Sequence, residues 1–149
     1  MTFSVPAADR AAAVEQLRTR AFPARPERAG AVLSGPAYHW ADLARTPVWD
    51  GDIADREDEK GRQELACCAL VETLTRMWGS APQTFSLMSL LLREAGGEEL
   101  PEPWDLLGRG VPELNLWRVD GRWIAIGVSG QQEDHERTLV VVVTVTDPP

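Results

Sequence analysis

The dipeptide Asp120-Gly121 constrains the fold of this chain more than any other feature, because it separates two largely apolar segments, 114–119 and 122–128. An Asp-Gly pair between such segments is the strongest short-range signal for a β-hairpin with a two-residue type I′ turn, in which both central residues adopt positive φ. A turn of that length fixes the register of the two strands. The cross-strand pairs that we expect are Val119 with Arg122, Arg118 with Trp123, Trp117 with Ile124, Leu116 with Ala125, and Asn115 with Ile126.

This register leaves both faces of the hairpin largely apolar. One face carries Trp117, Val119, Ile124 and Ile126, and the other carries Leu114, Leu116, Trp123 and Ala125. A third segment, 138–146, is almost entirely β-branched and follows a polar loop at 131–137, so we expect it to pair with the second strand at the centre of the sheet. The last third of the chain is therefore predicted to be an antiparallel β-meander.

Apolar residues that recur every three or four positions predict three amphipathic helices, at about 6–19, 55–78 and 86–95. The stripes expected to face the core are Ala11, Val14, Leu17 and Ala21 in the first helix, Cys67, Leu70, Val71, Leu74, Met77 and Trp78 in the second, and Met88, Leu91, Leu92 and Ala95 in the third. A strand over 83–88 is the competing prediction for the start of the third helix, since apolar and polar residues alternate there.

Together these patterns predict an α+β fold in which residues 1–149 form a single domain, long enough for one hydrophobic core. The expected architecture is one layer of antiparallel sheet with helices packed on one face. Residues 30–34 are expected to form a short strand, and residues 38–44 fit a strand or a short helix, with the extended form favoured. Whether the second face of the sheet is covered by the chain itself or by another subunit stays open, as does the oligomeric state.

The charge of the chain argues against several classes of partner. Its net charge of −8 and its pI near 4.7 disfavour nucleic acid, because phosphate binding depends on clustered Lys and Arg. No apolar segment approaches the roughly 20 residues that span a bilayer. The first residues also lack the basic start and the long apolar centre of a signal peptide. We therefore expect a cytoplasmic protein with a basic protein as its partner.

No pattern in the chain names a reaction. Cys67 and Cys68 are adjacent and cannot close an ordinary disulfide, so we expect both to be reduced core residues rather than nucleophiles. Residues 127–131 lack the second glycine of the G-x-S-x-G nucleophile elbow, and no glycine-rich phosphate loop occurs. The sequence leaves enzymatic activity open and favours binding over catalysis.

The spacing Asp50-x-Asp52 matches the start of an EF-hand calcium loop. That loop has an acid or amide at its fifth position, Gly at its sixth and Glu at its twelfth. This chain has Ala54, Asp55 and Gly61 there, so the pattern fails at all three positions.

The segment 133–136, Glu-Asp-His-Glu, together with His39 contains the residue types of a zinc or iron site. Consecutive residues of an extended chain point apart, so a polar hairpin loop explains the segment better. We predict that neither His39 nor His135 binds a metal ion, and we expect no cofactor.

The segment from Trp49 to Glu59 is the candidate partner-binding site. Arg56 is the single basic residue among positions 50–59, against six acidic ones. A tryptophan beside carboxylates suits a protein interface. The expected site residues are Trp49, Asp50, Asp52, Asp55, Glu57, Asp58 and Glu59. A competing interpretation is that these acids stabilise the N-terminus of the following helix.

These features favour a small acidic domain that covers a basic site on another protein, by electrostatic steering followed by apolar contacts. In size, charge and expected layout the chain resembles bacterial immunity proteins, which neutralise toxins in this way, although no motif carries the likeness. The alternative is a small enzyme or ligand-binding domain with a tryptophan-lined pocket between helices and sheet, and with His39, His135 or a carboxylate as acid or base. Trp40, Trp49 and Trp104 are the tryptophans expected to be partly exposed.

Overall fold

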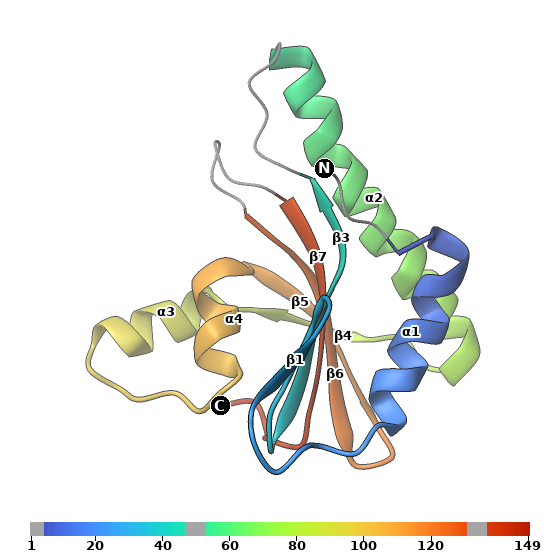
Figure 1. Ribbon diagram of the computed structural model, residues 1–149. Coiled ribbons are helices and arrows are strands. Elements are labelled where there is room, and N and C mark those ends of the chain that lie inside the picture. The colour runs from blue at the N-terminus through green and yellow to red at the C-terminus, as the bar shows by residue number, and fades with distance from the viewer. Residues whose placement is uncertain (1–4, 47–52, 131–136) are drawn as a thin grey trace.

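A seven-stranded antiparallel sheet runs through the part of the molecule that the structure describes (Figure 1). The structure is a computed structural model that describes residues 5–46, 53–130 and 137–149, and the side chains of residues 46 and 53–60 lie outside that description. The strands are β1 (Glu27–Ala29), β2 (Val32–Ser34), β3 (Tyr38–Thr46), β4 (Gln83–Ser86), β5 (Glu113–Val119), β6 (Arg122–Ser129) and β7 (Arg137–Thr144). Their order across the sheet is β1-β2-β3-β7-β6-β5-β4.

The C-terminal meander is confirmed. Asp120 and Gly121 both have positive φ, 51° and 80°, as a type I′ turn requires. The five cross-strand pairs expected between 115–119 and 122–126 are the pairs observed. Strand β7 pairs with β6 on one side and β3 on the other, so it lies at the centre of the sheet. The favoured extended form of residues 38–44 is confirmed as β3.

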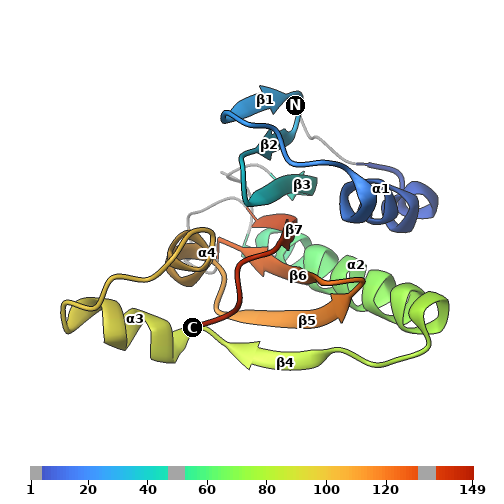
Figure 2. The same ribbon diagram turned by 90° about the horizontal axis from the view of Figure 1, so that it is seen from below.

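Helices cover both faces of the sheet, as Figure 2 shows. They are α1 (Ala7–Thr19), α2 (Ile53–Trp78), α3 (Met88–Ala95) and α4 (Trp104–Gly110). The first two pack on one face and the last two on the other. The expectation of helices on one face is therefore wrong, because strands that are apolar on both faces need cover on both. The chain itself supplies the cover of the second face.

Two hydrophobic cores lie on either side of β7. On the α1–α2 side Leu139, Val141 and Val143 pack with Leu70 and Leu74 of α2. On the opposite side the intervening valines of β7 pack against α4. This second core contains Val140, Val142, Leu87, Leu90, Trp104 and Leu107. The alternation of a β-strand thus divides one valine-rich segment between the two cores.

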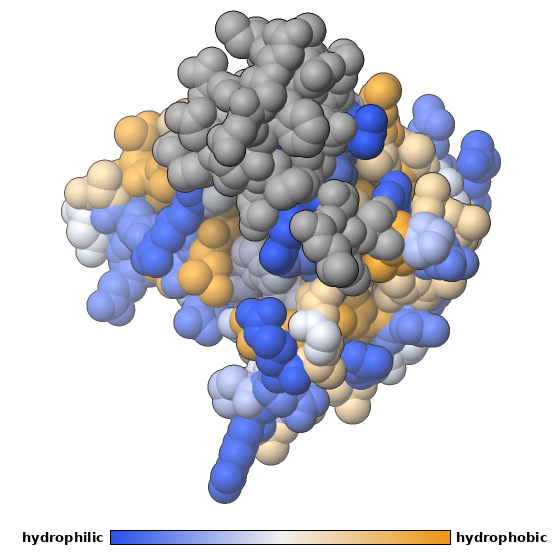
Figure 3. All heavy atoms as spheres, turned by 45° about the horizontal axis from the view of Figure 1, so that its top comes forward, coloured by the Kyte–Doolittle hydropathy of each residue, from blue (hydrophilic) through white to orange (hydrophobic). Residues whose placement is uncertain are grey.

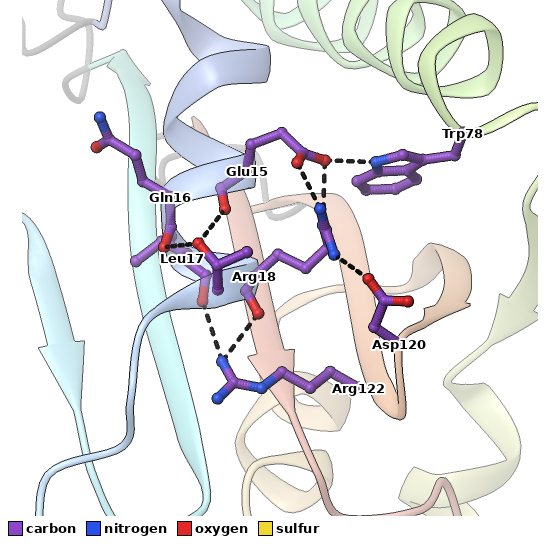
Figure 4. Close-up of polar contacts among 8 residues, drawn as sticks. Glu15, Gln16, Leu17, Arg18, Trp78, Asp120 and Arg122 are labelled. Carbon is purple, nitrogen blue, oxygen red and sulfur yellow. Dashed lines mark hydrogen bonds and ion pairs between the residues drawn. The ribbon is translucent and has the colours of Figure 1, made fainter.

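Polar contacts join the hairpin turn to the first helix (Figure 4). The Arg18 guanidinium donates to Glu15 and to Asp120, each at 2.6 Å, and the Trp78 indole N–H donates to the same Glu15 carboxylate. Arg122 donates to carbonyl oxygens at the C-terminus of α1, including that of Arg20 at 2.6 Å. The Arg18 hydrogen bond lowers the pKa of Glu15. These hydrogen bonds and ion pairs hold α1 on the sheet.

The segment 83–95 combines both predictions made for it, because β4 ends at Ser86 and α3 begins at Met88. The predicted core stripe of the helix is wrong, however. Met88, Leu91 and Leu92 are 60%, 40% and 69% exposed, and Leu90 is 1% exposed. The buried Leu87 is the N-cap residue, and its N–H donates to the Pro112 carbonyl at 2.9 Å. That contact sets the phase of α3, so the residue three positions later faces the core.

Other side chains also differ from their expected burial. Trp104 is 0% exposed, because α4 places it in the second core and its indole N–H donates to the Thr146 carbonyl at 3.0 Å. Met77 and Cys68 are exposed, since they lie at the margin of the α2 stripe, so only Cys67 of the two cysteines is a core residue. The expected core position of Trp117 is confirmed.

We predict opposite outcomes for two leucines of α3. Leu90→Ala should lower the free energy of unfolding by about 2 to 5 kcal/mol, because it removes a buried side chain and leaves a cavity. Leu92→Ala should change it by no more than about 0.5 kcal/mol, because that side chain is exposed. Urea denaturation of the two variants measures both values. Equal losses would contradict the orientation of α3.

Candidate protein-binding site

The predicted partner-binding segment lies largely beyond what the structure describes. Trp49, Asp50 and Asp52 are outside the described residues, and so is His135. The backbone at Asp55, Glu57, Asp58 and Glu59 belongs to the first turns of α2, while their side chains are not described. The role of this acidic segment in binding stays a prediction.

An open groove of about 320 Å³ lies between α2, the start of β5 and the end of β6. Its lining residues are Glu64, Cys67, Cys68, Pro112, Glu113, Asn115, Gly127 and Val128. We call it the α2–β5 groove. The exposed carboxylates of Glu64 and Glu113 come from opposite walls, one on the helix and one on the strand. The buried side chains of Cys67 and Val128 make its inner part apolar.

Gly127, which lines the α2–β5 groove, allows a close approach between β6 and the segment before β5. A Cβ atom at this position would lie 2.7 Å from Val111 Cγ1 and 2.8 Å from the Glu113 carbonyl oxygen, distances that packed atoms do not adopt. Glycine therefore lets the segment before β5 approach β6 and carry Glu113 to the groove.

The buried Cys67 of the groove is poorly suited to nucleophilic catalysis. Burial raises the pKa of the Cys67 thiol to about 11, so it is uncharged at neutral pH. The Asn115 amide donates to Cys67 Sγ at 3.8 Å and to the Ile126 carbonyl at 3.3 Å. Cys67 therefore serves as a packed wall of the groove rather than as a reactive group.

An exposed apolar surface begins at the same corner of the sheet. Glu113 pairs with Ser86, two residues before Met88, the first residue of α3. We define the α3 outer face by its exposed residues Met88, Leu91, Leu92 and Ala95. Hydrophobic atoms are visible over α3 at the left of Figure 3. Apolar surface of this kind on a monomer marks interaction sites, and i, i+3, i+4, i+7 is the spacing of a helix that docks in a groove.

The charges beside the α3 outer face are already paired within the chain. Arg93 binds Glu98 at 2.5 Å, and Arg109 binds Glu94 at 2.9 Å. This face therefore offers apolar contact with little net charge, whereas Glu64 and Glu113 of the α2–β5 groove form no ion pair with another described side chain. Sequence periodicity missed both surfaces, although Glu64 lies within two helical turns of the acidic segment and could have extended it along α2.

His39 is a satisfied core residue. It is 0% exposed and stacks on Phe22 with 4.7 Å between ring centroids. Nε2 lies 3.2 Å from the Arg20 carbonyl oxygen, which can only accept, so Nδ1 accepts from the Ser34 hydroxyl at 2.6 Å. Because His39 is buried and both of its ring nitrogens are hydrogen-bonded, its imidazole is not accessible for the acid or base role considered for it. Among the described residues, no group of three or more His, Cys, Asp or Glu is placed to hold a metal ion.

Comparison of the chain with models of protein families, with curated proteins and with solved structures finds no match. In the described part of the chain, no helix has both the length and the apolar character needed to cross a bilayer. The function is therefore argued from the geometry of these surfaces.

We predict that His39 makes stability depend on pH. Burial lowers the pKa of His39, and the Arg122 and Arg20 charges lower it further, although the hydrogen bond to the Arg20 carbonyl opposes them. The unfolded chain then binds a proton at higher pH than the folded protein does. The free energy of unfolding should be unaffected by His39 above about pH 7 and fall as pH drops through about 6.5, by at most about 1.4 kcal/mol per pH unit.

Urea denaturation between about pH 5.5 and pH 7.5 measures this dependence, with His39→Asn as the comparison variant. The slope should be smaller in the variant even if the variant is less stable at every pH. Identical slopes would show that burial of the imidazole does not shift its titration.

Proposed function

We propose that this chain is an acidic protein-binding domain that covers a basic site on a partner protein. The observation that carries the proposal is the α2–β5 groove, in which Glu64 and Glu113 flank an apolar inner part. The net charge of −8 supports a basic partner. In the described residues no group of three or more His, Cys, Asp or Glu is placed to hold a metal ion, and the Cys67 thiol of the groove is buried and protonated.

The groove suits an Arg or Lys side chain of the partner. The aliphatic stem of either residue can lie on Cys67 and Val128 while its cationic head reaches a carboxylate on each wall. An Arg head has five N–H donors and can bind two carboxylates at once. The groove thus suits a cation on an apolar stem that projects from the basic site of the partner.

Charge and apolar contact have separate roles in this proposal. The acids at the start of α2 and Glu64 raise the rate of encounter with a basic surface. The α3 outer face, which begins next to Glu113, then supplies the apolar contact that slows dissociation. The α2–β5 groove and α3 lie on opposite faces of the sheet, and both lie beside the start of β5, so a partner that engages both must reach around that edge.

The kind of activity that fits this arrangement is inhibition by coverage. An immunity-type protein of bacteria neutralises a toxin by covering a basic site on it, and we propose that this chain acts so in the cytoplasm. The acidic surface and the unpaired cysteines Cys67 and Cys68 agree with that setting.

We predict that neutralising the groove slows association with the partner. After affinity capture from the native host, association rates would be measured at two ionic strengths for the wild type and for Glu64→Gln/Glu113→Gln. The groove variant should associate several-fold more slowly at low salt and show a weaker salt dependence, because two steering charges are lost. Asp50, Asp52 and Asp55 changed to Asn should act in the same direction.

The matched control is Glu72→Gln/Glu99→Gln, which removes the same charge from two exposed carboxylates outside the groove. Circular dichroism should show all variants folded. If the groove variant and the control associate at the same rate, net charge alone explains binding and the groove is not the site.

A further inference from the structure

A second pocket, of about 310 Å³, lies between α4 and the strands β1 to β3. It is separate from the α2–β5 groove and shares no residue with it. Its apolar walls include Leu33, Trp40 and Leu106, and its charged residues are Arg28, Asp42 and Arg45. The volume lies at the lower end of the about 300 to 1,000 Å³ that small-molecule sites occupy.

The indole of Trp40 differs from the other tryptophans that the structure describes. The other four donate their N–H to acceptors within the chain: Trp78 to Glu15, Trp104 to Thr146, Trp117 to Ser80 and Trp123 to Asp147. Trp40 donates its N–H to no acceptor among the described residues. The buried polar atoms that lack a partner do not include its indole nitrogen, so this nitrogen is accessible from outside. Its N–H is therefore open to a ligand.

The charged residues of this pocket leave one cation uncompensated. Arg45 pairs with Asp42, so these two charges largely cancel. Arg28 lies on the exposed edge strand β1, and no residue in the described ranges forms an ion pair or hydrogen bond with its guanidinium. The pocket thus combines a cationic donor, a neutral donor and an aromatic surface, and its net charge is positive in a protein of net charge −8.

We propose that this pocket binds a planar aromatic carboxylate. The ring lies on Trp40 between Leu33 and Leu106, because aromatic rings stack in offset or edge-on arrangements against apolar walls. The carboxylate accepts from the Arg28 guanidinium and from the Trp40 N–H. An anionic acceptor satisfies both donors, whereas a cationic ligand would satisfy neither. This site is independent of the partner-binding groove.

The test uses 2-naphthoate as the probe and measures its binding to the full chain by isothermal titration calorimetry. We expect saturable binding of one naphthoate per chain. Arg28→Gln should weaken it by about tenfold to a hundredfold, the effect of losing one charge-assisted hydrogen bond. Arg25→Gln is the matched control, since Arg25 is an exposed arginine outside the pocket, and it should bind as the wild type does.

A neutral analogue, 2-naphthamide, separates charge recognition from ring stacking. The wild type should bind the amide more weakly than the acid, and Arg28→Gln should make little further difference to the amide. Trp40→Leu should weaken both probes. If that variant does not fold, the comparison of Arg28→Gln with Arg25→Gln still decides. No saturable binding of naphthoate to the wild type, or equal affinity in Arg28→Gln and Arg25→Gln, overturns the proposal.

Discussion

Every residue of β7 from Arg137 to Thr144 is buried, so the central strand of the sheet is shielded from water on both faces. Its five apolar residues, Leu139 to Val143, alternate between the two cores. Burial of one such side chain stabilises the fold by about 1.5 to 3 kcal/mol. All five side chains contribute only if both faces of the strand are covered. This requirement explains why α1 and α2 lie on one side and why α3 and α4 must lie on the other. The arrangement in Figure 2 follows from a single strand that has no polar face.

The surfaces proposed for binding are consequences of how that cover is built. The long helix α2 crosses the first face and leaves an open groove beside β5, where Gly127 lets the chain approach closely enough to present Glu113. On the second face, α3 packs against the core with one side only. Leu90 enters the core and the α3 outer face is left exposed. Stability and the proposed binding therefore draw on different sides of the same helices.

The sequence predicts the parts of the fold that depend on local chemistry. Asp120-Gly121 specifies its turn and hence the register of β5 and β6, because positive φ at both positions is a property of those two residues. The orientation of α3 could not be predicted, since it depends on the contact of Leu87 with Pro112, which lies far away in the chain. The burial of Trp104 could not be predicted for the same reason, because the acceptor of its indole N–H is the distant Thr146 carbonyl. The groove depends on Glu64 of α2 and Glu113 of β5 lying on opposite walls, which no periodicity reveals.

Native-state hydrogen exchange tests the central role of β7 most directly. If both cores depend on this strand, the amides of Val140, Val141 and Val142 should exchange only when the whole protein unfolds. Their exchange free energies should then equal the free energy of unfolding measured with denaturant, while the amides of α3 should exchange through smaller openings. Exchange of the β7 amides at a free energy well below that of global unfolding, or below that of α3, would contradict this account of the fold.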